Sequence, residues 1–219
     1  HVAVWSPAPR KQEKADLVKL FNTDLDELKI FLINVEAFST PKGVKFTENF
    51  ILGHQVLFAV DESTTIKNPK ASRTKAITKL AKNTKYRRIL TGSPITQSPL
   101  DLYSQTEVLD TNLLGYTSFY SFQNHYGEVV NRYFGGRTVR QVVGYRNLDE
   151  LSQKLDSFSY RVLKSDCLDL PEKLYIRRDV TLTAEQKKLY GELKELAITE
   201  LANQEMVSVT NVLTQLLRL

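Results

Sequence analysis

The stretch VLFAVDEST, residues 56–64, joins an apolar run to two adjacent carboxylates, Asp61 and Glu62. A continuous apolar run is typical of a strand that is buried on both faces of a parallel sheet. Ligands of open parallel sheets bind beyond the carboxyl ends of the strands, so both acids would point into that crevice. One carboxylate could hold Mg²⁺ through its water shell, and the second could orient a water that attacks a phosphate. The same letters also fit a strand that ends in an acidic turn and binds nothing.

Further strands and helices are predicted on both sides of this stretch. Apolar runs at residues 2–5, 30–35 and 88–90 indicate three more buried strands. Residues 11–21 and 71–81 place apolar side chains at helical spacing. Alternating strands and helices predict an α/β layer fold with a parallel sheet.

The character of the chain changes in its second half. Aromatic residues crowd together between residues 116 and 126, where packing in a core is favoured over stacking on bases. Residues 131–145 predict a β-hairpin that turns at paired glycines, and Asn147 with Glu150 fits a helical capping box. We therefore predict an insert of helices and a hairpin over residues 106–163, docked on the α/β core.

The last part of the chain predicts a returning strand followed by helices. Residues 174–182 alternate apolar and polar side chains, which is a strand pattern. Thr183 with Gln186 forms a second capping-box pattern, opening a helix that would run to about Asn203. Residues 207–219 are apolar at helical spacing and predict a final helix.

Charge and cysteine content narrow the function classes. The net charge is +5, and no acidic residue occurs between Glu62 and Asp101, where lysine and arginine are frequent. This basic block is either a footprint for a polyanion or a solvated helix face. Cys167 is the single cysteine, which excludes an intrachain disulfide and favours a reducing, cytoplasmic compartment. No apolar run approaches the roughly 20 residues of a membrane span, so we expect no membrane partner.

A second pattern follows the predicted strand at residues 88–90. The letters TGSP, residues 91–94, precede a stretch with helical spacing over residues 101–109. Small hydroxyl residues at a strand end can couple one site to its neighbour through short hydrogen bonds. Taken alone, the same letters fit a Gly-Pro turn that caps the next helix.

The patterns taken together carry a family resemblance. DEST, IKNPKASRTK, LTGSP and DLYSQ, in this order, resemble motifs II and III of the superfamily 2 helicases. Within them the chain resembles the switch/sucrose-non-fermenting branch of DNA translocases. VAVWSP at residues 2–7 looks like motif Ia, and LINVEAF at residues 32–38 looks like motif Ib. Downstream, YRVLKSDCLDLPEK, VTLTAEQKKLYGEL and NVLTQLLRL resemble the segment that leads from the first lobe to the second.

The resemblance implies an incomplete RecA-like lobe over residues 1–105. The insert over residues 106–163 follows, and residues 164–219 lead towards a second RecA-like lobe. The implied function is ATP-dependent movement on DNA, with Mg·ATP as fuel and duplex DNA and the second lobe as partners. The alternatives are a degenerate, non-catalytic module that binds DNA or protein, and an RNA-directed helicase of the same superfamily.

The resemblance also implies roles for individual residues. Asp61 would bind Mg²⁺ through water, and Glu62 would be the catalytic base. The residues that couple the nucleotide state to DNA contact would be Thr64, Thr91, Gly92, Ser93 and Gln97. The residues that lie along DNA would be Ser6, Pro7, Lys67 and Asn68.

Two departures from the family pattern and one missing motif matter. Motif III normally reads TGTP, and Ser93 keeps the hydroxyl in this chain. The family usually has histidine where this chain has Thr64, and that histidine joins motif II to motif III. In this chain the Thr64 hydroxyl would have to make the contact, with Gln97 or Thr91 as its partner. The phosphate-binding loop G-x-x-x-x-G-K-[ST] occurs nowhere in the chain, and in the family it precedes motif Ia. We therefore expect that these residues alone hydrolyse no ATP.

Overall fold

The computed structural model describes residues 1–22, 27–167, 169, 171 and 174–202. The chain divides into two compact units, His1–Arg161 and Val162–Leu219. Within the described ranges, no helix combines the length and the hydropathy that a bilayer span requires.

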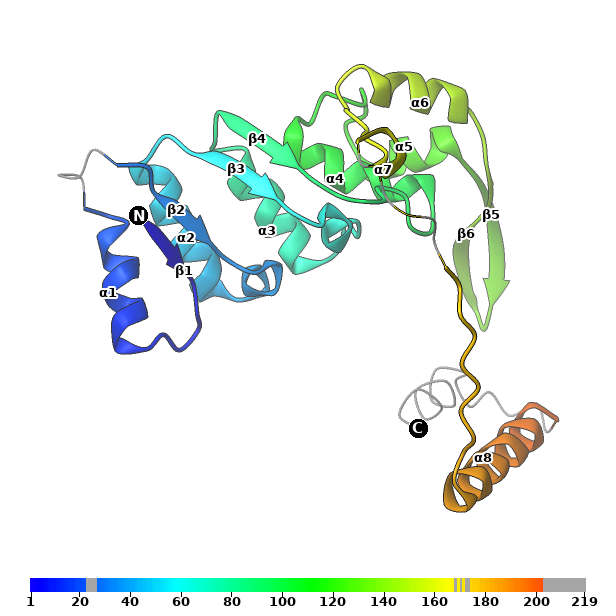
Figure 1. Cartoon of the computed structure of the whole chain (residues 1–219). Helices are drawn as coiled ribbons and strands as arrows, with labels where there is room; N and C mark the ends of the chain where they lie inside the picture. The colour runs from blue at the N-terminus through cyan, green and yellow to red at the C-terminus, as the bar shows by residue number, and fades with distance from the viewer. Residues whose placement is uncertain (23–26, 168, 170, 172–173, 203–219) are drawn as a thin grey trace. The chain divides into compact units, whose positions relative to one another are not determined.

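The first half of the larger unit alternates strands with helices (Figure 1). The elements in order are β1 (Val2–Val4), α1 (Lys11–Lys19), β2 (Ile30–Leu32), η1 (Val35–Ser39), α2 (Pro41–Gly53), β3 (Leu57–Val60), η2 (Ser63–Ile66), α3 (Ser72–Ala81) and β4 (Tyr86–Ile89). β1 pairs with β2, and β3 pairs with β4; both pairs are parallel. The α/β class is confirmed, and all four predicted strands are present. Helix α2 is an addition to the predicted elements.

The helices pack on one face of these strands. Ala3 of β1 is buried with Leu17 of α1, Leu20 at the end of α1 and Phe50 of α2. Around β3, the buried cluster is Phe38, Ile51, Val60, Ile66, Ile77, Leu80, Ala81 and Val108. These clusters fix the carboxyl end of β3 relative to α3.

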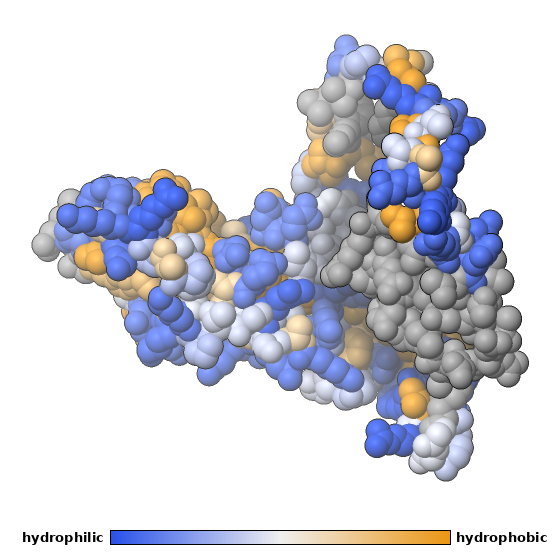
Figure 2. Space-filling model, turned by 90° about the horizontal axis from the view of Figure 1, so that it is seen from below, coloured by the Kyte–Doolittle hydropathy of each residue, from blue (hydrophilic) through white to orange (hydrophobic). Residues whose placement is uncertain are grey.

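The opposite face of the strands is exposed. Alternate side chains on it remain accessible to solvent: Val4 is 57% exposed and Leu57 is 60% exposed. Figure 2 shows exposed hydrophobic residues (orange) in the part of this unit that carries β1 and β2. The prediction that these strands are buried on both faces is therefore wrong for the described chain, because only one face has helices packed on it.

We expect this face to tolerate polar substitution in the 219-residue chain. Val4→Thr and Leu57→Thr should each change the free energy of unfolding by less than about 0.5 kcal/mol, because the side chains are already solvated. Ile77→Ala, at a position only 1% exposed, should cost about 2–5 kcal/mol. Urea unfolding of the three variants checks this contrast. Equal losses for Leu57→Thr and Ile77→Ala would mean that the strand face is covered.

The second half of the larger unit forms the predicted helices and hairpin (Figure 1). The elements are η3 (Pro99–Asp101), α4 (Leu102–Leu109), α5 (Phe119–Tyr126), β5 (Gly127–Phe134), β6 (Arg137–Tyr145) and α6 (Leu148–Asp156). β5 and β6 are antiparallel, and their turn is Gly135-Gly136. Both glycines have positive φ, +53° and +81°, a region that favours glycine. The predicted hairpin and its turn are thus confirmed.

The crowded aromatics form a second core, as predicted. Phe122 and Tyr126 of α5 are fully buried, and they pack with Tyr103 of α4 and Leu151 of α6. Helix α4 also sends Val108 into the cluster around β3. The predicted boundary between residues 105 and 106 falls inside this helix, and the division into lobe and insert stays a prediction.

The capping box predicted at Asn147 and Glu150 is wrong, although α6 begins where expected. Asn147 has a φ of +56°, and its side-chain amide donates to the carbonyl of His125 at 3.0 Å. The Glu150 carboxylate accepts hydrogen bonds from the His125 ring and from the Tyr126 hydroxyl, at 2.7 and 3.0 Å. The hydrogen bond with His125, followed by that with Lys154, lowers the pKa of Glu150 to about 2. Both residues therefore fasten α6 to α5 instead of capping α6.

In the smaller unit the described helices are α7 (Lys164–Cys167) and α8 (Ala184–Ala202). The capping box at Thr183 and Gln186 is confirmed by reciprocal hydrogen bonds of 3.0 and 3.3 Å. The strand predicted over residues 174–182 is wrong: this segment has no regular structure, and Leu174 is 85% exposed. Residues 207–219, where a last helix is predicted, lie outside the described residues.

Candidate functional site

Strand β3 ends at the two predicted acids. Val60 is buried, and Asp61 and Glu62 follow it in exposed positions at the carboxyl end of the strand. Backbone hydrogen bonds continue beyond the two strands: Leu90 donates to the Val60 carbonyl at 2.9 Å, and Ser63 donates to the Leu90 carbonyl at 3.0 Å. The DEST segment and the start of the TGSP segment therefore lie side by side at one edge of the β3–β4 pair.

The backbone at Glu62 is unusual. Glu62 has φ +48° and ψ +55°, a left-handed conformation that few residues other than glycine adopt. Its amide donates to a carboxylate oxygen of Asp61 at 3.0 Å, and its carbonyl accepts from the amide of Thr65 at 2.9 Å. Strained backbone of this kind is concentrated at active sites, where the surrounding structure enforces it. The strain thus marks residue 62 as a functional candidate independently of its side chain.

The donor set around Asp61 fits one kind of metal. Among the described residues, no group of three or more histidine, cysteine or acidic side chains comes together as a metal site. Mg²⁺ needs less from the protein, because it keeps several waters and takes one or two carboxylates together with substrate phosphates. The exposed carboxylate of Asp61, only one oxygen of which accepts the Glu62 amide, fits that requirement.

A buried hydrogen-bond network joins the DEST and TGSP segments. The Ser63 hydroxyl donates to the side-chain oxygen of Gln105 at 2.7 Å. The Gln105 amide nitrogen donates to the carbonyls of Pro94 and Asp101, both at 2.8 Å. Ser63 is 0% exposed and Gln105 is 1% exposed. One side chain of α4 therefore holds η2, the TGSP segment and η3 together.

Gln105 is not among the predicted site residues. The sequence does contain a signal for it, since Gln105 lies in line with Leu102 and Leu109 on the apolar face of the predicted helix. A polar residue on such a face, when buried, needs hydrogen-bond partners. The sequence does not reveal that its partner would be a serine 42 residues earlier.

The predicted coupling residues are placed differently from the expectation. No hydrogen bond in the described part of the chain joins Thr64 to Gln97 or to Thr91. The Thr91 hydroxyl accepts from the amide of Ser93 at 3.2 Å, and Gly92 lies between them with open space around it. The amide of Gln97 donates to the Asp101 carboxylate at 3.0 Å. The bridge between the two motifs is made by Ser63, the neighbour of Thr64.

The predicted DNA-binding residues fall into two groups, one that follows β1 and one that follows η2. Ser6 and Pro7 come after β1; the Pro7 carbonyl accepts from Lys42 at 2.8 Å. Lys67 and Asn68 come after η2, and the Asn68 side chain accepts from the amide of Lys70 at 2.9 Å. No contact described in the structure joins the two groups, so their common role stays a prediction.

Lys67 is held in place by the TGSP side of the site. Its ammonium donates to the Thr96 hydroxyl at 2.6 Å and lies 3.8 Å from the Asp101 carboxylate. That carboxylate also accepts from the backbone amides of Thr96, Gln97 and Ser98. Burial alone would raise the pKa of Asp101, but the hydrogen bonds from Gln97 and Thr96, with the charge of Lys67, lower it overall.

Low pH should therefore destabilise the turn at residues 96–101, which the Asp101 carboxylate holds together. Because the pKa of Asp101 is lower in the folded chain than its usual 3.8, its contribution to stability is complete above about pH 4 and is lost as the pH falls through the folded value. Asp101→Asn, which keeps one acceptor oxygen, should remove this pH dependence. Thermal unfolding from pH 6 to pH 2 should show the wild-type advantage over the variant shrinking below about pH 4. A constant difference across this range would refute the assignment.

Comparison with known proteins identifies the family. Residues 16–219 match the SNF2-related domain, so the chain belongs to that family. It is 34% identical over 177 residues to the mouse (Mus musculus) protein named DNA annealing helicase and endonuclease ZRANB3, a match that covers 78% of this chain and 16% of that protein. It is 28% identical over 161 residues to an uncharacterized ATP-dependent helicase of Mycoplasma genitalium, covering 73% of this chain and 14% of that protein.

A third relative is the Caenorhabditis elegans homologue of SWI/SNF-related matrix-associated actin-dependent regulator of chromatin subfamily A-like protein 1. It is 33% identical over 142 residues, covering 61% of this chain and 19% of that protein. In each of these three comparisons the matched region is less than a fifth of the relative's length. The RecA-like α/β lobe expected from the sequence is the fold of this family, and the family membership confirms the resemblance seen in the motifs.

Proposed function

We propose that this chain is part of the first RecA-like lobe of an ATP-dependent DNA translocase. The observation that carries the proposal is the pairing of DEST with TGSP at the carboxyl edge of β3 and β4. Two adjacent acids at that edge, with a strained backbone at Glu62, form an arrangement suited to binding a nucleoside triphosphate with its metal ion. The names of the relatives, which include helicases that act with ATP or on DNA, support the same function.

In this proposal the two acids divide the chemistry. Glu62 accepts a proton from the attacking water and orients it towards the γ-phosphate. Asp61 would hold Mg²⁺ through its water shell, and the bound ion would stabilise the negative charge of the phosphates. The loop that would hold the phosphates is absent from these 219 residues, so we expect no hydrolysis from them alone.

The link between nucleotide and DNA would pass through the TGSP segment. Thr91, Gly92 and Ser93 follow Leu90, whose carbonyl accepts a hydrogen bond from the Ser63 amide, and Gln105 joins Pro94 to the Ser63 hydroxyl. On the other side, Lys67 contacts Thr96 just after TGSP. A change at the acids could therefore reach Lys67 through three hydrogen bonds: Ser63 to Gln105, Gln105 to Pro94, and Lys67 to Thr96.

DNA contact is proposed for the two groups of residues that follow β1 and η2. Lys67 would neutralise a phosphate, with Asn68, Ser6 and Pro7 along the same strand. Lysines and arginines of the basic block, which has no acidic residue between Glu62 and Asp101, support a polyanion partner. The substrate proposed is duplex DNA, with a second RecA-like lobe closing on this one, and action on DNA agrees with an intracellular, reducing location.

The experiment that separates this proposal from its alternatives uses the complete protein. We expect ATP hydrolysis to rise at least about tenfold with duplex DNA and to rise less with single-stranded RNA. Stimulation by RNA equal to that by DNA would favour an RNA-directed helicase. The absence of any hydrolysis, with DNA binding intact, would favour a non-catalytic module.

A further inference from the structure

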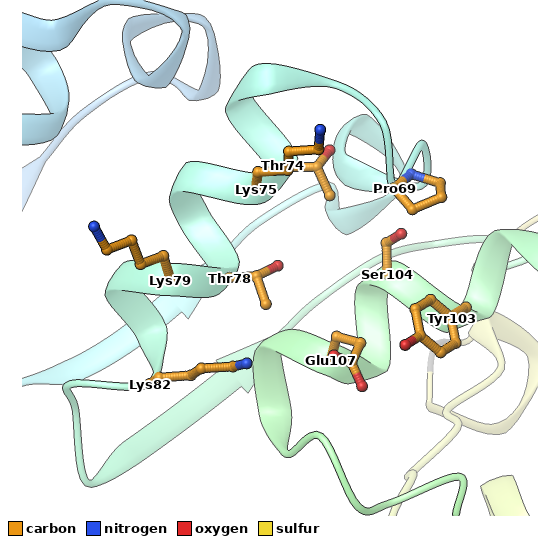
Figure 3. A pocket seen from close by; sticks show the side chains of 9 residues that line it. All are labelled: Pro69, Thr74, Lys75, Thr78, Lys79, Lys82, Tyr103, Ser104 and Glu107. Carbon is orange, nitrogen blue, oxygen red and sulfur yellow. The ribbon is translucent and has the colours of Figure 1, made fainter. Parts of the chain in front are cut away.

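Two hollows on the described part of the chain differ in charge. The first lies between α3 and α4 (Figure 3), where lysines of α3 and Glu107 of α4 line it together. The second, of about 400 Å³, lies where the β5–β6 hairpin meets the end of α5, and its lining has no acidic residue. The residues that line the second hollow are Asn124, Gly127, Val129, Asn131, Arg140 and Arg146. The second hollow is therefore the one that suits an anion.

The end of α5 holds two arginines at this hollow. Arg140 donates to the side-chain oxygen of Asn124 at 2.5 Å, and its guanidinium lies 5.9 Å from the centre of the Tyr120 ring. Arg146 donates to the carbonyls of Asn124 and His125 at 2.6 and 3.1 Å. A guanidinium has five N–H groups, and these bonds use one on Arg140 and two on Arg146. Both side chains are thus held in position while other donors remain available to an acceptor.

The positive charge of the hairpin is not neutralised within the described part of the chain. Residues 127–146 contain four arginines, no lysine and one acidic residue, Glu128. None of the ion pairs among the described residues includes these arginines. The Glu128 carboxylate lies against Gly144, and because side chains alternate along a strand, it is on the face opposite Val129 and Asn131. The one acid of the hairpin therefore does not face the hollow.

A phosphate group fits the donors at this hollow. A guanidinium pairs with phosphate through two parallel N–H···O bonds, and asparagine side chains also donate to the phosphates of nucleic acids. Asn131 of β5 is the cross-strand partner of Arg140 of β6, so their side chains are neighbours on one face of the hairpin. This pair of side chains is suited to a phosphate of a nucleic-acid backbone.

An exposed ring on the same face selects the kind of nucleic acid. Tyr133 pairs with Thr138, one pair further along the face that carries Arg140, and Tyr133 is 74% exposed. Successive pairs on one face lie about 7 Å apart, so a phosphate at Arg140 and a base at Tyr133 are within reach of one extended strand. Aromatic side chains stack on the bases of single strands, whereas paired bases inside a duplex have no free face. The ring therefore favours a single strand over a duplex.

We propose that this face of the β5–β6 hairpin binds single-stranded DNA. Arg140 and Asn131 bind a backbone phosphate, Tyr133 stacks on an unpaired base, and Arg146 adds positive charge at the base of the hairpin. The inference rests on the proposed function only in taking DNA as the partner. None of these residues is among those proposed to contact duplex DNA, so the hairpin adds a separate contact for an unpaired strand.

The first test measures fluorescence anisotropy of a labelled oligothymidylate with the 219-residue chain. Arg140→Gln should weaken binding about tenfold, because it removes a charge-assisted contact with phosphate. The slope of log affinity against log salt should fall by about 0.7, the value for one phosphate contact on a single strand. Arg132→Gln is the matched control: Arg132 is on the same hairpin but pairs with Val139 on the opposite face, so its variant should bind as tightly as the wild type.

Two variants of Tyr133 test the stacking. Tyr133→Ala should weaken binding of the oligothymidylate about tenfold and leave its salt slope unchanged, because stacking releases no counterions. Tyr133→Phe keeps the ring and should bind as the wild type does. The proposal is wrong if the wild-type chain does not bind the oligothymidylate, or if Arg140→Gln and Tyr133→Ala bind it as the wild type does. Thermal unfolding checks that each variant is folded, and if one is not, the other decides.

A blunt DNA duplex separates this site from the proposed duplex contact. Tyr133→Ala should leave duplex binding unchanged, because paired bases do not stack on the ring. If Tyr133→Ala weakens duplex binding as much as binding of the oligothymidylate, the hairpin follows duplex DNA and the single-strand proposal is wrong.

Lys67→Gln distinguishes failure of this inference from failure of the proposed function. It should weaken binding of the duplex, since Lys67 is proposed to neutralise a phosphate of duplex DNA. If Lys67→Gln has this effect while the hairpin variants bind the oligothymidylate as the wild type does, only the inference about the hairpin is wrong. If the hairpin variants behave as expected while Lys67→Gln leaves duplex binding unchanged, the proposed duplex contact is wrong and the hairpin site stands.

Discussion

Glu62→Gln should lower the DNA-stimulated ATPase rate of the complete protein by about 100- to 10,000-fold, the range typical for loss of a general base. Glutamine keeps the shape of the side chain but cannot accept the proton from the attacking water. The left-handed backbone at this position is set by the neighbouring hydrogen bonds, so the variant should fold as the wild type does. ATP binding should be retained, and steady-state hydrolysis with saturating duplex DNA measures the effect.

Glu128→Gln is the matched control for this substitution. Glu128 is also an exposed glutamate, but it lies in β5, outside the DEST and TGSP segments. Its variant should keep the wild-type rate. If Glu62→Gln retained more than about half of that rate under conditions where its fold is intact, Glu62 would not be the base, and the role would pass to another residue or to no residue at all.

The second large effect is expected at Gln105. Gln105→Ala should destabilise the chain by about 1–3 kcal/mol, because it leaves the buried Ser63 hydroxyl without its partner and removes the hydrogen bond to the Pro94 carbonyl. In the complete protein it should also lower the ratio of DNA-stimulated to basal hydrolysis by about fivefold or more, a typical coupling between sites. The basal rate should change less than this ratio, since Gln105 does not touch the acids. Gln97→Ala changes an exposed residue that the sequence predicts to couple the two sites. It should strongly change neither the stability nor the ratio of DNA-stimulated to basal hydrolysis.

A double-mutant cycle with Ser63→Ala tests whether the hydrogen bond carries the effect. If Ser63 and Gln105 act through one contact, the double variant should be more stable than the sum of the single losses predicts, by about 0.5–3 kcal/mol. The DNA-stimulation ratio should show the same non-additivity. Strict additivity in both measurements would mean that Gln105 only supports the fold of α4.

Local patterns explain which parts of the fold could be predicted. Strand β3 and the hairpin at Gly135-Gly136 follow from short runs and a turn with positive φ, and both are present. The segment 174–182 has an equally regular alternation but no strand. Alternation shows which side chains would share a face, whereas a strand also needs a neighbour with which to pair, and that depends on distant residues.

The same difference governs the site. The adjacency of Asp61 and Glu62 to TGSP follows from parallel pairing of β3 with β4, which strand order alone suggests. Ser63, and not Thr64, makes the bridge because the backbone turns at Glu62, which has a φ of +48°. The sequence of the DEST segment does not reveal this conformation. Gln105 reaches the site across 42 residues of chain, so no spacing within a motif indicates the contact. Whether the second face of the strands is covered likewise depends on residues outside the apolar runs that predict the strands.

The most direct test of the central claim is metal binding at the end of β3. Mn²⁺ can replace Mg²⁺ with a non-hydrolysable ATP analogue, and its electron paramagnetic resonance signal reports how much metal is bound to the complete protein. Asp61→Asn should weaken Mn²⁺ binding in the presence of the analogue by about tenfold or more, while binding of the analogue without metal stays unchanged. Equal Mn²⁺ affinity in the wild type and in Asp61→Asn would contradict the assignment of this strand end to the nucleotide.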